Sequence, residues 1–113
     1  MAYHDQTLTA LFHALSDPTR LAVVETLCDG PHSVGQLAEP YDMALPSFLK
    51  HVRVLEDAGL VRSHKKGRVR TVSLVPQRMA QADAWIAARR HMWERRLDSF
   101  GDYLDKTSKE TDT

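Results

Sequence analysis

The chain is short of cysteine, of long apolar runs and of net charge, and each shortage excludes a class of protein. Its single cysteine, Cys28, cannot form an internal disulfide, which is typical of proteins in a reducing cytoplasm. No segment approaches the run of about 18 apolar residues that a membrane-spanning helix needs. Residues 1–5 also lack the basic and apolar regions of a signal peptide. We therefore expect a cytoplasmic protein with no membrane partner.

Catalytic signatures are absent as well. The sequence contains no glycine-rich phosphate loop, no His-Glu-x-x-His metalloprotease motif and no nucleophile elbow. With 113 residues, of which 42% are hydrophobic and 27% are charged, the chain is long enough for one domain with its own core. The sequence therefore predicts a globular protein that is not an enzyme and needs no cofactor.

The formal net charge of zero conceals an uneven distribution of charge. Residues 1–49 contain one cation and six acids, and residues 98–113 contain two cations and five acids. Residues 50–70 contain seven cations and only two acids. Because solvent ions screen the attraction of phosphate within about 8–10 Å, local charge matters more than the total. The segment 50–70 is therefore the candidate surface for a nucleic acid.

The spacing of apolar residues predicts a mostly α-helical fold with one small β-hairpin. Asp17 followed by Pro18 marks the start of the second helix, and Ser33 is placed to cap the third. Gly59 ends the fourth helix, and Gly67 can supply the positive φ of a tight hairpin turn. Helices are expected at residues 7–15, 18–29, 33–38, 44–58 and 77–104, and strands at 60–64 and 69–74.

Two of these helices have a clear buried stripe. In the second helix the stripe is predicted to be Leu21, Val24 and Leu27. In the fourth helix the inward positions are predicted to be Leu45, either Phe48 or Leu49, Val52 and Leu55.

The outer face of the fourth helix and the hairpin are rich in cations and polar groups. Arginine and lysine can donate to guanine O6 and N7, and hairpin cations can contact phosphates or enter the minor groove. The alternatives are a solvated helix face and cations that prevent edge-to-edge strand pairing. The residues predicted to bind double-stranded DNA are Ser47, Lys50, His51, Arg53, Arg62, Lys65, Lys66, Arg68 and Arg70.

The last predicted helix carries too much apolar surface to remain in water on a domain of this size. We expect it to form a dimer interface together with the first helix; the alternative is that it packs only on its own domain. The residues predicted at this interface are Leu8, Leu11, Phe12, Trp85, Ile86, Met92, Trp93 and Phe100. Residues 106–113 are expected to form a frayed polar tail.

These motifs resemble those of the ArsR family of bacterial winged helix-turn-helix repressors. The resemblance rests on the segments 15–21, 33–38 and 50–61 and on the Lys66-Gly67-Arg68 turn, and it covers roughly residues 8–75. It implies one winged helix-turn-helix domain over residues 1–105, with DNA bound by residues 33–75. Residues 1–15 and 77–105 would form a homodimer that represses transcription from a palindromic operator.

The sequence departs from the family pattern at several positions. Leu49 stands where many members carry serine in the recognition helix. Metal-sensing members have cysteines at the positions of Ser33 and Gly35, and others have an acid-x-His pair at the positions of Arg78 and Ala80. The resemblance is therefore to the branch of the family that binds no metal.

Some sensing residues remain as alternatives. His91 and Glu94 match half of a family metal site, which leaves too few ligands for a tetrahedral ion. Cys28 is expected to be a small core residue. The alternatives to a plain DNA-binding regulator are a metal- or redox-responsive sensor that uses these residues, and a winged-helix module that binds an acidic protein. The sequence does not indicate a small-molecule effector.

Overall fold

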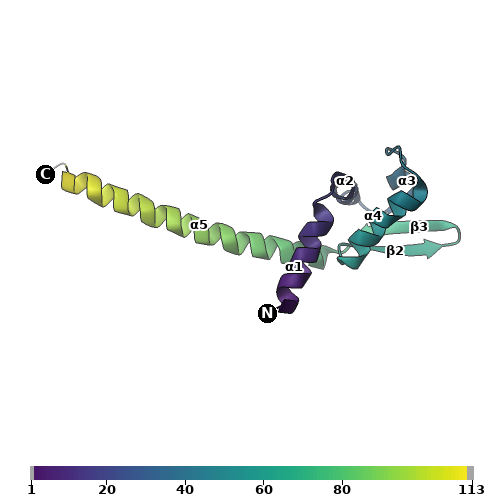
Figure 1. The fold of residues 1–113 in the computed structure, drawn as a ribbon, viewed down its shortest axis with the longest axis horizontal. Helices are drawn as coiled ribbons and strands as arrows, with labels where there is room; N and C mark the ends of the chain where they lie inside the picture. The colour runs from purple at the N-terminus through teal and green to yellow at the C-terminus, as the bar shows by residue number, and fades with distance from the viewer. Residues whose placement is uncertain (1, 112–113) are drawn as a thin grey trace. The chain divides into compact units, whose positions relative to one another are not determined.

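The computed structural model describes residues 2–111 of the chain, with side chains from residue 7 to residue 108. In chain order the elements are α1 (Ala2–Leu15), α2 (Pro18–Leu27), β1 (His32–Ser33), α3 (Val34–Ala38), α4 (Leu45–Asp57), β2 (Val61–Lys66), β3 (Val69–Leu74) and α5 (Pro76–Thr111) (Figure 1). The predicted mostly helical fold with a hairpin is confirmed.

The chain divides into two compact units, and the single domain over residues 1–105 stays a prediction. The first unit ends at Gln81 and the second begins at Ala82, within α5. Helix α5 also continues through residues 106–111, where we expected a frayed tail, and residues 112–113 lie outside the described part. Alanines and long-chain residues favour helix in the part of α5 before residue 106, and no proline interrupts the helix after Pro76.

The starts of α2 and α3 follow the predicted capping chemistry. The Asp17 carboxylate accepts a hydrogen bond from the backbone N–H of Arg20 at 3.1 Å, and Pro18 occupies the first turn of α2. Ser33 and Gln36 form a capping box, in which each side chain accepts from the other's backbone N–H at 3.1 and 3.0 Å. These bonds satisfy donors that a helix N-terminus leaves without an intrahelical partner.

The core of the first unit is built around the inner face of α4. The sequence left open whether Phe48 or Leu49 points inward, and the structure buries Phe48 completely and leaves Leu49 38% exposed. Helix α4 contacts α1, α2, α3 and β2. The largest fully buried side chains are Phe48, Leu11, Leu55, Leu60, Val23, Val52 and Val72.

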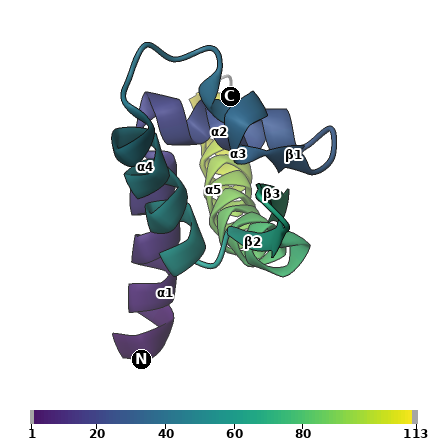
Figure 2. The same cartoon turned by 90° about the vertical axis from the view of Figure 1, so that its right-hand side faces the viewer.

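The sheet has three antiparallel strands in the order β1-β3-β2 (Figure 2). Strand β2 extends two residues past the predicted end at His64, so the hairpin has a two-residue loop, Gly67-Arg68. Gly67 has a φ of +63°, as the tight turn requires. Strand β1 was not predicted; it pairs His32 with Val72, and two residues are too few to show strand alternation.

Three predicted core residues are on the surface. Leu45, which we expected to point inward, is the first residue of α4 and is 52% exposed. Leu21 is 43% exposed, and Val23 takes its place beside Val24 and Leu27 in the buried face of α2. Cys28, which we expected in the core, is exposed because it is the C-cap of α2, one residue beyond the last buried position. Leu21 lies in the first turn of α2 and Cys28 just beyond its last turn, where the buried face of the helix does not extend.

Gly59 ends α4 with a φ of +76° and should be essential for stability. A Cβ there would lie 2.5 Å from Nε of Arg78, and the left-handed conformation costs an L-residue about 1–2 kcal/mol. We expect Gly59→Ala to lower the free energy of unfolding by about that amount in urea denaturation. Gly35→Ala is the matched control, because its Cβ would meet only Oγ of Ser33 at 3.9 Å. Equal stability of the two variants would contradict this role of Gly59.

Candidate nucleic-acid interface

Helix α4 is the predicted recognition helix, and its outer face is exposed. With Phe48 and Val52 buried, the helical period of 3.6 residues turns Lys50 and Arg53 away from the core. Both side chains are exposed, as is Ser47 in the first turn. Pro46 is tolerated beside them because it lies in the first turn, where its missing N–H has no intrahelical partner.

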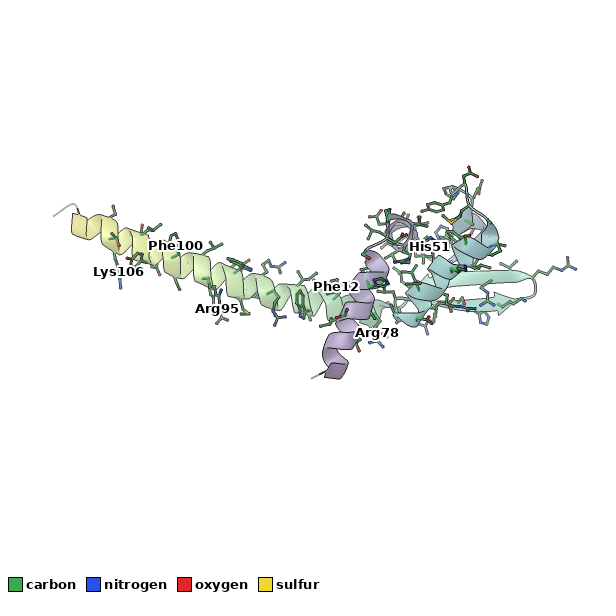
Figure 3. All side chains as sticks on the ribbon, viewed as in Figure 1. Phe12, His51, Arg78, Arg95, Phe100 and Lys106 are labelled. Carbon is green, nitrogen blue, oxygen red and sulfur yellow. The ribbon has the colours of Figure 1, made fainter. Side chains whose placement is uncertain are left out.

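The cations of the β2–β3 hairpin, which we call the wing, are all exposed. They are Arg62, Lys65, Lys66, Arg68 and Arg70. The register distributes them over both faces of the hairpin. Lys65 pairs with Arg70 on the face that also carries the buried Val72, whereas Arg62 and Lys66 point to the other face. Figure 3 shows a long side chain that ends in nitrogen extending beyond the turn of the wing.

A short chain of hydrogen bonds connects α4 to the wing. The hydroxyl of Ser63 donates to Oε1 of Glu56 at 2.9 Å, and the guanidinium of Arg70 donates to the same Ser63 oxygen at 2.9 Å. Arg70 and Arg53 also line one surface hollow together with Leu49. The sequence did not reveal this chain, because nothing in its pattern pairs residues of the helix with residues of the hairpin.

A second cluster attaches α4 to the start of α2. The guanidinium of Arg20 donates to the backbone oxygens of Ala14 at 2.7 Å and His13 at 3.3 Å, and lies 3.2 Å from Nδ1 of His51. The Asp17 carboxylate is 3.7 Å from the same Nδ1. His51 is thus half-buried toward α2, on the side of the helix away from the wing, and does not share the exposed face of Lys50.

The Arg20 contact fixes which nitrogen of His51 is available to a ligand. Nδ1 of His51 faces the guanidinium of Arg20 and the carboxylate of Asp17, so Nε2 is the ring nitrogen left for a ligand. The cluster also acts on Asp17. The hydrogen bond from the Arg20 backbone N–H, together with the nearby charges of His51 and Arg20, lowers the pKa of Asp17, and desolvation opposes this only in part.

The second unit is one amphipathic segment of α5. Its exposed large apolar residues lie within an arc of about 140° on the helix, and they are Trp85, Ile86, Met92, Trp93, Leu97, Phe100, Tyr103 and Leu104. Figure 3 shows Arg95, Phe100 and Lys106 along this helix. The guanidinium of Arg89 lies over the ring of Trp85, 4.8 Å from its centroid.

The predicted interface residues of α1 behave differently from those of α5. Leu8 and Leu11 are buried in the first unit, and Leu11 has no exposed surface. These two side chains therefore have little accessible area for a partner, and their place at an interface stays a prediction. Phe12, which is 36% exposed, is the one of the three that keeps accessible surface.

Comparison with known proteins decides the family. A helix-turn-helix domain family matches residues 15–64. The HTH-type transcriptional regulator Rv2034 of Mycobacterium tuberculosis is 33% identical over 100 residues, which cover 88% of this chain and 91% of that protein. The solved structure of an ArsR family transcriptional regulator is 48% identical, with a TM-score of 0.76, and the match covers 80% of this chain and 93% of that one. This chain belongs to the ArsR family.

Two further comparisons bear on the role and on the fold. The transcriptional repressor SdpR of Bacillus subtilis is 30% identical over 76 residues, 67% of this chain and 84% of that protein. A homodimeric winged helix-turn-helix domain from Mycobacterium bovis shares the fold, with 20% identity, a TM-score of 0.64, and coverage of 80% of this chain and 86% of that one. The chain is therefore a DNA-binding transcriptional regulator with the winged helix-turn-helix fold.

The predicted alternatives for sensing can be located in this regulator. His91 and Glu94 form an exposed pair on α5, with Nδ1 and Oε2 3.8 Å apart. Among the described residues no group of three or more His, Cys, Asp or Glu side chains is placed to hold a metal ion. Within the same residues, no helix combines the length and the apolar character that a bilayer crossing requires.

The lowered pKa of Asp17 predicts a pH-dependent contribution to the stability of the regulator. A carboxylate whose pKa is lower in the folded chain stabilises the fold above its unfolded pKa of about 3.9, and this contribution disappears as the pH falls through the folded value. Asp17→Asn keeps a capping oxygen but removes the charge. We expect it to be less stable than the parent in urea at pH 7 and equally stable at strongly acidic pH.

A second variant separates the charge of Asp17 from its capping bond. Asp17→Ala removes the acceptor for the Arg20 N–H and should remain about 1 kcal/mol less stable than Asp17→Asn at every pH. A stability difference between parent and Asp17→Asn that does not change with pH would contradict the electrostatic account.

Proposed function

We propose that the regulator is a homodimeric repressor that binds a palindromic operator through α4 and the wing. One observation carries the proposal: the exposed face of α4 with Lys50 and Arg53 adjoins a wing whose cations are all exposed. A repressor acts where the DNA is, so we also infer that it works in the cytoplasm. The relative SdpR, which is named a transcriptional repressor, supports repression rather than activation.

In this proposal α4 enters the major groove and reads base edges. Lys50 and Arg53 would donate to guanine O6 and N7, and the Ser47 hydroxyl can donate or accept near the start of the helix. His51 would contribute through Nε2, because Nδ1 faces Arg20 and Asp17. Its position toward α2 suits a contact with the phosphate beside the groove rather than with a base.

The wing would supply affinity through phosphate contacts or the minor groove. Lys65, Lys66, Arg68, Arg62 and Arg70 lie on both faces of the hairpin, so the wing can neutralise phosphates on either side of its axis. Each phosphate neutralised releases counterions and makes binding more sensitive to salt. Such contacts orient the protein on the duplex without selecting a sequence.

Base reading by α4 and phosphate binding by the wing can be tested separately. Binding isotherms are measured at several salt concentrations, with a duplex selected from a random pool and with a random duplex. Lys50→Ala should reduce the ratio of specific to non-specific affinity about tenfold, since a base contact is worth about 1–3 kcal/mol. The double variant Lys66→Ala with Arg68→Ala should bind both duplexes more weakly. It should also reduce the slope of log K against log salt by about two.

The control for charge is a double variant in the second unit, Arg95→Ala with Lys106→Ala. It removes the same number of cations from exposed positions of α5. An equal change of slope in this control would show that total charge, and not the wing, determines the salt dependence. Unchanged selectivity in Lys50→Ala would contradict base reading by α4.

The dimer is proposed from the apolar face of α5. Eight large apolar residues exposed along one helix form more apolar surface than a small protein usually leaves in water. A second copy of the same helix would bury this face in a two-fold interface. Dimerisation would also hold two α4 helices about 34 Å apart, which is one turn of B-DNA and the spacing that a palindromic operator needs.

Trp93→Glu should dissociate this dimer, because the side chain is 63% exposed in the centre of the apolar face and a carboxylate there would lose its water in the interface. We expect sedimentation equilibrium at micromolar concentration to show a dimer for the parent and a monomer for the variant. Ala88→Glu places the same charge about 140° away on the helix and should remain dimeric. A monomeric parent, or dissociation of both variants, would contradict an interface on this face.

A further inference from the structure

A groove between α4 and the wing combines apolar side chains with cations. It has a volume of about 550 Å³, and α3 closes one side of it. Leu45, Leu49 and Val69 line it although they are 52%, 38% and 52% exposed. Lys65, Arg68 and Arg70 are among its other lining residues, and none of its lining residues is acidic. The groove is thus an apolar surface bordered by positive charge.

The charge of the groove indicates what kind of molecule it binds. Cations without a lining carboxylate favour a polyanion, and the apolar surface requires that this polyanion also present apolar groups. Duplex DNA meets both conditions in its major groove, where phosphates border base edges and the thymine 5-methyl is the apolar group on display. An acidic protein with apolar side chains is a different class of partner and becomes an outcome of the test.

Leu49 is the side chain that gives this groove its selectivity. It lies next to Lys50 on α4 and lines both this groove and the neighbouring hollow shared by Arg53 and Arg70. A leucine has no hydrogen-bond donor or acceptor, so it cannot satisfy the edge of guanine, adenine or cytosine. A polar base edge held against it would lose its water and gain no partner, which is unfavourable.

We propose that Leu49, together with Leu45, contacts thymine 5-methyl groups, so that each operator half-site carries a thymine facing this groove. The inference rests on the proposed placement of α4 in the major groove and names what one part of that helix reads. Arg70, held by the bond to Ser63, would lie beside the same base step and hold the phosphate next to it.

The test replaces thymine with deoxyuracil, which differs only by the missing 5-methyl. A duplex is selected from a random pool with the parent protein, and each thymine is then replaced singly while the dissociation constant is followed by fluorescence anisotropy. Burial of one methyl-sized group gives about fourfold in affinity. We expect a loss of that size at one or two positions per half-site and no loss at the others.

Variants assign the effect to the leucines. In Leu49→Ala or Leu45→Ala the deoxyuracil penalty at the sensitive position should disappear, because the methyl no longer has its apolar contact. Leu21→Ala is the matched control: Leu21 is 43% exposed on α2 and outside the groove, so the full penalty should remain. The substitution in the DNA needs no variant protein, so the test holds even if a leucine variant folds poorly.

The outcomes that overturn the inference differ from those that overturn the function. Selective binding with equal affinity for thymine and deoxyuracil duplexes refutes methyl reading and leaves the DNA-binding proposal intact. A penalty that persists in both leucine variants refutes the assignment to these residues. No preference for any duplex over competitor, with binding of an acidic leucine-containing peptide instead, would refute both.

Discussion

The burial of the inner face of α4 is the constraint on which the rest of the first unit depends. Phe48, Val52 and Leu55 are at most 2% exposed and pack among α1, α2, α3 and the sheet. Once these three positions are fixed, the helical period determines which residues face outward. Lys50 and Arg53 are therefore exposed because of what lies opposite them, and the face proposed to bind DNA is a consequence of the core.

Two polar clusters attach α4 at different sides and reduce its freedom to rotate or tilt. One is centred on Arg20, which bonds the end of α1 and the ring of His51. The other runs from Glu56 through Ser63 to Arg70 in the wing. Long cationic side chains lose conformational entropy when they bind. If Arg70 binds DNA as proposed, its bond to Ser63 reduces the entropy that binding must remove.

Much of the first unit could be predicted from the sequence because its signals are local. The caps at Asp17 and Ser33 and the turn at Gly67 depend on neighbouring residues, and the structure confirms all three. Periodicity alone could not decide between Phe48 and Leu49, which are adjacent on the helix, or detect a two-residue strand. The clusters of Arg20 and Glu56 join residues up to 31 positions apart, and such contacts leave no pattern in one sequence.

The stability of the long helix α5 connects the proposed dimer to operator recognition. An isolated helix in water gains little from its own hydrogen bonds, and its stability comes mainly from packing an amphipathic face. The eight exposed apolar residues of α5 are therefore the part of the chain that most needs a second copy. If that copy is required, folding of the second unit depends on protein concentration, and so does the fixed separation of two α4 helices. Operator occupancy should then rise with protein concentration more steeply than for a monomer, because dimer assembly and the reading of two half-sites are one linked equilibrium.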